Sequence, residues 1–135
     1  MKTATTILQT LVRLAGVILI VLGVLFWTDH ALTLVPVHML VGFVLVFSLW
    51  ALAVRAARTG VHPGLVALAI VWGFIVPVLG LTQERLLPGD AHWVVQVLHL
   101  LVGLGAIGQA EGLAARIKGR RPADPNAQHK LLLGG

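Results

Sequence analysis

The sequence contains no cysteine and few charged side chains. Without cysteine, the chain has no disulfides, thiolate metal sites, iron–sulfur clusters or thiol nucleophiles. Charged residues make up 11% of the 135 residues, whereas 58% are hydrophobic. The resulting mean hydropathy of +0.94 is that of a membrane protein and not of a soluble domain.

Several functional signatures are also missing. No Ser–His–Asp set, phosphate-binding loop or HExxH motif is visible, so hydrolysis has no support. The formal net charge of +5 would suit a nucleic-acid partner. The basic residues, however, flank apolar segments instead of forming a stripe on a polar face. We therefore expect no nucleic-acid partner, and a lipid bilayer as the surroundings.

Four long apolar segments cover about 7–28, 33–56, 64–82 and 92–115. Each is close to the ~20 residues that a helix needs to cross a hydrocarbon core. Backbone groups in lipid must pair internally, so these segments should be helices, and short connections make neighbours antiparallel. The sequence predicts an all-α integral membrane four-helix bundle in up-down-up-down order. This domain spans residues 1–118, and a disordered cytoplasmic tail is expected at 119–135.

Lysine and arginine are distributed unevenly between the two ends of this bundle. Only Arg85 lies in the connection between the third and fourth segments. The other nine lie at the termini or between the second and third segments: Lys2, Arg13, Arg55, Arg58, Arg116, Lys118, Arg120, Arg121 and Lys130. Because basic loops stay in the cytoplasm, we expect both termini there, in an inner or plasma membrane. A cleaved signal peptide is the alternative for the first segment, and its length disfavours that.

The two halves of the chain resemble each other. Shifts of 54 and 61 residues align the first segment with the third and the second with the fourth. The second shift matches Asp29, His38, Gly42 and Arg55 with Asp90, His99, Gly103 and Arg116. We interpret this as two tandem two-helix repeats, about 7–58 and 64–118, related by a pseudo-twofold axis along the membrane normal. Chance similarity between leucine-rich helices is the alternative.

Each repeat carries one intramembrane histidine, in His38-Met-Leu-Val-Gly42 and in His99-Leu-Leu-Val-Gly103. Both lie about two turns into their segments, towards the outer leaflet. An imidazole in hydrocarbon is costly without a partner, and haem iron accepts one imidazole on each side. We therefore predict one haem b with His38 and His99 as its metal ligands. Another metal, a proton-transfer role and structural hydrogen bonds remain open alternatives.

Glycines accompany these histidines at regular spacings. The glycines at i+4 share a helix face with the histidines and would let a flat macrocycle lie against the backbone. Two further pairs, seven residues apart, would clear the flanking helices in the same way. Ordinary close packing of membrane helices is the alternative for all of them. The candidate cofactor-binding glycines are Gly16, Gly23, Gly42, Gly73, Gly80 and Gly103.

Three further residues are candidates for cofactor binding. Gln96 lies one turn before His99 and would orient a ligand or a bound quinone, or simply hydrogen-bond within the packing. Arg85 and Trp93 are candidate neighbours of the haem propionates near the outer rim. Interface anchoring is the alternative for both.

Acidic residues have simpler expected roles. Asp29 and Asp90 should cap the second and fourth helices. Glu111 lies near the predicted cytoplasmic boundary, where pairing with Arg55 or Arg116 is favoured over proton transfer.

Four helices with one histidine on the second and one on the fourth, about sixty residues apart, resemble a half-bundle of the haem A synthase family. The resemblance covers most of the chain at the level of architecture and implies that His38 and His99 are axial haem ligands. That family also carries a glutamate one turn before its first active-site histidine. This chain has Val35 there, which disfavours substrate oxidation and favours electron carrying.

We therefore expect a small membrane b-type cytochrome with one bis-His haem near the outer leaflet, acting in electron transfer more than in catalysis. A quinone or a redox partner protein would be its partner, and self-association stays open. One alternative is a non-redox scaffold or accessory subunit. The other is a small transporter or proton relay that uses His38, His99 and Glu111.

Overall fold

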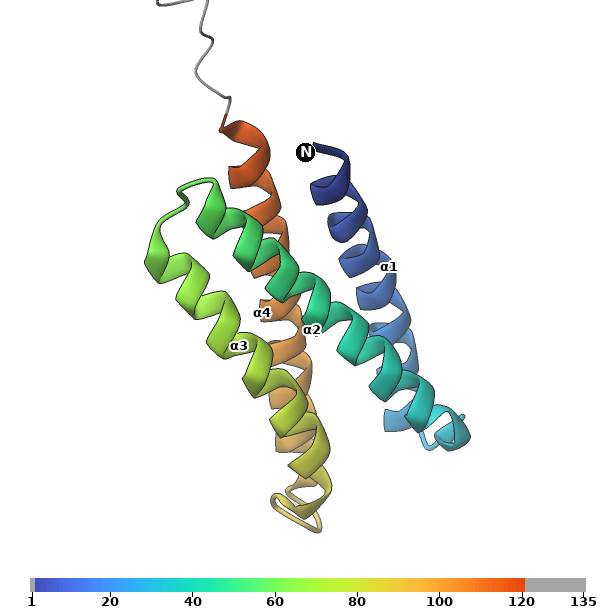
Figure 1. Cartoon of the computed structure of the whole chain (residues 1–135). Coiled ribbons are helices and arrows are strands. Elements are labelled where there is room, and N and C mark those ends of the chain that lie inside the picture. The colour runs from blue at the N-terminus through green and yellow to red at the C-terminus, as the bar shows by residue number, and fades with distance from the viewer. Residues whose placement is uncertain (1, 121–135) are drawn as a thin grey trace, which may run out of the picture.

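The computed structural model describes residues 2–120 and consists of helices (Figure 1). The four α-helices are α1 (Lys2–Trp27), α2 (Val35–Arg58), α3 (Pro63–Thr82) and α4 (His92–Gly119). Two short 3₁₀ helices, η1 (Leu32–Leu34) and η2 (Gln83–Arg85), lie in the first and third connections. No strand occurs in this range, so the predicted all-α class is confirmed.

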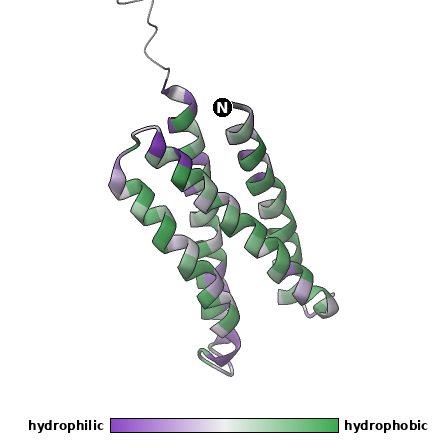
Figure 2. Cartoon of the chain, viewed as in Figure 1, coloured by the Kyte–Doolittle hydropathy of each residue, from purple (hydrophilic) through white to green (hydrophobic). Residues whose placement is uncertain are grey.

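All four helices are long and apolar enough to cross a membrane. The candidate spans have mean hydropathies between 1.5 and 2.4. Figure 2 shows hydrophobic residues along the helices and hydrophilic ones gathered towards their ends and connections. These features fit a multi-pass membrane protein, as the four apolar segments of the sequence predict.

Two helices form the centre of the bundle. α2 and α4 contact each other and both remaining helices, whereas α1 and α3 do not contact one another. One end of the bundle, the upper end in Figure 1, holds the start of α1, the connection between α2 and α3, and the end of α4. We call this the basic end, because Arg58, Lys118 and Arg120 lie there. η1 and η2 lie at the opposite end.

The core of the basic half is made of small and branched side chains from α2 and α4. The fully buried positions on α2 are leucines and alanines, and alanines on α4 let the two backbones approach closely. Two indole N–H groups link neighbouring helices: Trp50 Nε1 donates to Ile70 O at 3.1 Å, and Trp72 Nε1 donates to Val102 O at 2.8 Å. The central buried residues are Leu49, Leu52, Ala53, Ala56, Ala106, Ala110, Leu113 and Ala114.

The helix caps differ from those expected. Leu34 and Ala91 are the N-cap residues of α2 and α4, and neither makes a side-chain cap. The prediction that Asp29 and Asp90 cap these helices is therefore wrong. Asp29 has a φ of 56°, in the left-handed region, and lies before η1. α3 instead carries a side-chain cap, because the Nδ1 of His62 accepts a hydrogen bond from Gly64 N at 3.1 Å.

The end of α4 is fixed to the α2–α3 connection. α4 continues to Gly119, one residue beyond the predicted domain limit. Arg120 Nη1 donates to Thr59 O at 2.9 Å and also to Gly60 O. Gly60 turns the chain there with a φ of 74°, which favours glycine. The rest of the predicted tail, 121–135, lies outside the described residues.

Candidate functional site

The half of the bundle opposite the basic end contains a partly open cavity of about 520 Å³. All four α-helices and η1 and η2 contribute to its lining. Most of the lining side chains are apolar, including Leu19, Phe43 and Leu104. The polar ones are few and are described below.

His38 of α2 and His99 of α4 both line this cavity. The centroids of their imidazole rings are 6.3 Å apart, and the ring planes are inclined by 45°. Their helices are the central pair of the bundle, so the two side chains meet although they lie 61 residues apart in sequence. The ring of Phe26 packs 5.4 Å from that of His38 and closes the α1 side.

Neither imidazole forms a hydrogen bond with any group in residues 2–120. The Nδ1 atoms of His38 and His99 are buried without a partner. Buried polar atoms in proteins are almost always hydrogen-bonded. No hydrogen bond among residues 2–120 therefore supports the alternative that these histidines crosslink the helices.

Five of the six candidate glycines line the same cavity: Gly16, Gly23, Gly42, Gly80 and Gly103. A Cβ atom at Gly23 or Gly103 would meet nothing within 4 Å, so both open onto free space. A Cβ at Gly80 would lie 3.1 Å from Cε1 of His99, which shows how closely this ring packs on the α3 backbone.

Gly73 has a different environment from the other five. It is buried beneath the indole of Trp50, and a Cβ atom there would collide with Trp50 Nε1. Gly73 does not line the cavity. It allows α2 and α3 to pack closely in the basic half.

The mouth of the cavity is polar. Gln96 lines it, as does His92 one turn earlier on α4, whose Nδ1 lies 3.3 Å from Leu86 O. Asp29, Gln83 and Glu84 complete this rim. From the sequence, His92 was open between an exposed and a propionate-facing position, and neither Asp29 nor Glu84 was expected at this site. The i, i+4, i+7 spacing of His92, Gln96 and His99 on one face of α4 is the signal that would have placed His92 there.

The other two candidates lie elsewhere. Arg85, in η2, and Trp93, in the first turn of α4, are exposed and are not among the residues lining the cavity. The Trp93 side chain is 56% exposed. Anchoring at the membrane interface, the alternative named for Trp93, therefore stays open.

Glu111 forms a polar cluster with α1. Its carboxylate accepts hydrogen bonds from Arg13 Nε at 2.7 Å, Arg13 Nη2 at 2.9 Å and Gln9 Nε2 at 2.5 Å. Lys118 Nζ donates to Gln9 Oε1 at 2.5 Å and extends the cluster along α4. We call these four residues the α1–α4 clip. Glu111 does not line the cavity.

The expected pairing of Glu111 with Arg55 or Arg116 is therefore wrong. Arg55 Nε donates to Thr5 Oγ1 at 3.1 Å, and Arg116 Nη1 donates to Gly112 O at 3.0 Å. Because α1 packs against α4 at this level, Arg13 lies beside the Glu111 carboxylate and pairs with it.

No family model, curated protein or solved structure matches this chain. The function of this chain is therefore inferred from the cavity and from the two histidines that line it. Residues 2–120 hold no group of three or more His, Cys, Asp or Glu side chains placed to bind a metal ion. A haem, by contrast, requires only two axial ligands from the protein.

Proposed function

We propose that this chain is a membrane b-type cytochrome that holds one bis-His haem between α2 and α4 and serves in electron transfer. One observation carries the proposal. His38 and His99 face a single cavity with their ring centroids 6.3 Å apart. When bound there, a haem supplies a one-electron redox couple.

The separation of the two rings fits axial ligation of one iron atom. A metal–imidazole bond is about 2 Å long, and the ring centre lies about 1.2 Å beyond the nitrogen. The observed centroid separation of 6.3 Å would let both imidazoles reach one iron atom. His38 and His99 would hold that iron between α2 and α4.

The walls of the cavity also fit a flat, apolar macrocycle. Its volume of about 520 Å³ lies within the range of about 300–1,000 Å³ for cofactor pockets. Gly23 and Gly103 leave free space beside the histidines, where a larger residue would intrude. The lining beside the histidines includes apolar side chains such as Phe26, whose ring packs 5.4 Å from that of His38. The other polar lining groups lie at the mouth.

The chain offers no acid beside His38 for substrate oxidation. Val35, one turn earlier on α2, lines the cavity at the position where the haem A synthase family carries a glutamate. This residue supports electron carrying over catalysis, with a quinone or a redox partner protein as the exchange partner.

The same proposal includes the orientation and the internal symmetry. The excess of lysine and arginine at the basic end favours an up-down-up-down bundle with both termini in the cytoplasm of an inner or plasma membrane. The haem would then lie near the outer leaflet. The central placement of α2 and α4, with α1 and α3 on their flanks, is what two tandem helical hairpins with a pseudo-twofold axis would produce.

The two rival functions receive less support. A scaffold in which histidines join helices needs hydrogen bonds that the described residues do not make. A proton relay through His38, His99 and Glu111 needs the acid close to the imidazoles. Glu111 is instead engaged by Arg13 and Gln9, away from the cavity.

Optical spectroscopy of the purified full chain tests the proposal. We expect haem titration to saturate at one haem per chain, with a Soret band and sharp α and β bands after reduction. A preparation that stays colourless after addition of haemin would reject the cytochrome function.

Substitution of the two ligands tests the site. His38→Ala and His99→Ala should each abolish the six-coordinate low-spin spectrum, because each removes one axial nitrogen. His30→Ala is the matched control: the His30 Nδ1 contacts Thr28 O at 2.5 Å, and the side chain is exposed. Retention of six-coordination in both ligand variants would show that the iron is held elsewhere.

A further inference from the structure

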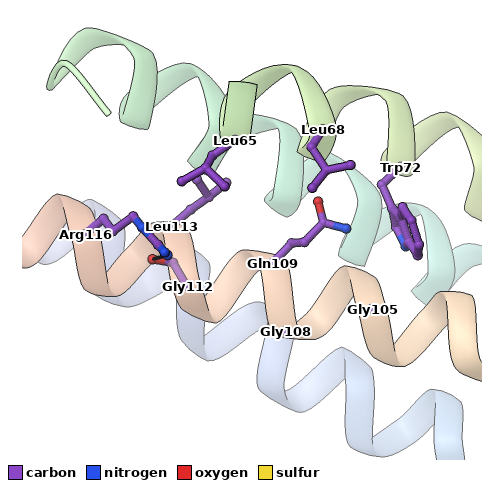
Figure 3. Close-up of a pocket in the computed structure, with 9 residues that line it drawn as sticks. All are labelled: Leu65, Leu68, Trp72, Gly105, Gly108, Gln109, Gly112, Leu113 and Arg116. Atoms are coloured by element: carbon purple, nitrogen blue, oxygen red, sulfur yellow. Dashed lines mark hydrogen bonds between the residues drawn. The ribbon is translucent and has the colours of Figure 1, made fainter. Parts of the chain in front are cut away.

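A second cavity lies between α3 and α4 in the basic half and is separate from the histidine site (Figure 3). Its volume is about 440 Å³, and most of its lining is apolar. We call it the α3–α4 groove. It is lined by Leu65, Leu68, Trp72, Gly105, Gly108, Gln109, Gly112, Leu113 and Arg116.

The groove is elongated. The lining on α4 runs from Gly105 to Arg116, which corresponds to about 16 Å of helical rise. A space of about 440 Å³ spread over this length and lined mostly by apolar groups suits an extended hydrocarbon chain.

Bare backbone forms one wall of the groove. Gly105, Gly108 and Gly112 lie on α4, opposite Leu65, Leu68 and Trp72 of α3 (Figure 3). A Cβ atom at Gly108 would meet nothing within 4 Å, so the space beside it is free. The Trp72 indole closes the inner end and is fixed there by its bond to Val102 O.

Two polar side chains face this otherwise apolar space. Arg116 folds back along α4 and donates to Gly112 O, and it has no carboxylate partner in residues 2–120. The amide of Gln109 points into the groove in Figure 3, and its Oε1 is buried without a hydrogen-bond partner in the same range. Gly112 and Gln109 are separated by about 4.5 Å of helical rise. A cation and an amide thus lie about one turn apart along one groove.

We propose that the α3–α4 groove binds one anionic glycerophospholipid. The phosphate pairs with the Arg116 guanidinium, whose charge no acidic side chain neutralises. The ester region lies one turn deeper, at the Gln109 amide, which can donate and accept. One acyl chain follows the glycine wall past Leu68 to Trp72. Basic groups at the mouth of a pocket between membrane helices are a general means of selecting anionic headgroups.

Native mass spectrometry of the full chain in detergent tests this proposal. The probes are phosphatidylglycerol and phosphatidylcholine with identical acyl chains, each added to delipidated protein. We expect one phosphatidylglycerol to be retained per chain, with phosphatidylcholine bound more weakly. Equal retention of the two lipids by the unmodified protein would overturn the proposal.

Two variants localise the site. Arg116→Gln should weaken phosphatidylglycerol binding about fivefold, the effect of one membrane-facing cation. Gly108→Leu should displace both lipids, because the new side chain fills the free space. Arg85→Gln removes the same charge at the opposite end of the bundle and should leave binding unchanged. Unchanged binding in both groove variants would overturn the assignment.

A second copy of the chain is the competing occupant. If it covered the α4 glycines, the protein would remain a dimer without lipid and Gly108→Leu would make it monomeric, a result that overturns the lipid proposal. The inference is independent of haem binding. Unchanged helical circular dichroism and thermal unfolding in Arg116→Gln and Gly108→Leu would show that these variants fold and that only the groove is affected.

Discussion

The two halves of this bundle differ in how the space between α2 and α4 is filled. In the basic half, side chains from α2 and α4 fill the space between the helices, and Leu49, Leu52 and Ala53 are fully buried. In the other half, glycines and two histidines surround a cavity of about 520 Å³. The basic half also holds the α3–α4 groove and the unpartnered Gln109 Oε1, but its contact between α2 and α4 is filled. In the other half, α2 and α4 each carry a buried imidazole nitrogen without a partner. We call them the packed half and the cavity half.

This difference separates stability from function. A protein interior is close-packed, and each void loses the contacts of the atoms that would have filled it. The packed half supplies the contacts that fix the helix positions, so that the cavity half can keep its space. α2 and α4 then hold the two histidines at a fixed separation, because the contacts that fix these helices lie in the packed half.

The largest expected effect comes from filling the cavity half. Gly103→Leu places a side chain where a Cβ atom now meets nothing within 4 Å. Haem content should fall from about one per chain to nearly zero, while the ligand-free protein keeps or raises its unfolding temperature. Absorbance and thermal unfolding in detergent measure the two effects.

The matched control for this change is Gly108→Leu, which fills the α3–α4 groove and should keep its haem. A Gly103→Leu protein with full haem content would break the comparison, because the cavity would then not be the cofactor site.

The next largest effect comes from emptying the packed half. Leu49→Ala should lower the free energy of unfolding by about 2–5 kcal/mol, since it removes a fully buried side chain from a close-packed core. Leu104→Ala changes a residue that lines the cavity and is 43% exposed, and it should cost less than about 1 kcal/mol. Equal losses in unfolding titrations of the ligand-free variants would show that the halves do not differ in packing.

The smallest expected effect concerns the α1–α4 clip. Glu111→Gln should lower the free energy of unfolding by about 1 kcal/mol, because the paired side chains are 31% and 63% exposed and solvent screens them. Glu84→Gln, at the exposed rim of the cavity half, should change stability by less than about 0.5 kcal/mol. A loss of 3 kcal/mol or more in Glu111→Gln would mean that the clip, and not the apolar core, fixes α1.

The helices were predictable because hydrophobic length alone determines them. The four apolar segments of the sequence each overlap one observed helix, and their ends differ from the helix ends by at most five residues. The spacing of His38 and His99 likewise predicted a common site, and the structure brings the two rings to 6.3 Å. Periodicity places both residues on particular helix faces, and the pairing of α2 with α4 makes those faces meet.

Contacts that depend on which helix lies opposite were not predictable. The seven-residue spacing keeps Gly73 and Gly80 on one face of α3, but that face meets Trp50 of α2 at one level and His99 of α4 at another. The partner of Glu111 was wrong for the same reason. A list of apolar segments does not say that Arg13 of α1, and not Arg55 of α2, packs beside it.

The α1–α4 clip also has a consequence for biosynthesis. Arg13 is synthesised 98 residues before Glu111, and Gln9 is synthesised 109 residues before Lys118. At about 5–20 residues per second, the ribosome needs roughly 5–20 seconds to deliver Glu111 after Arg13. During that interval the Arg13 cation has no carboxylate from α4. The first helix is therefore joined to the last only when translation of the fourth span is nearly complete.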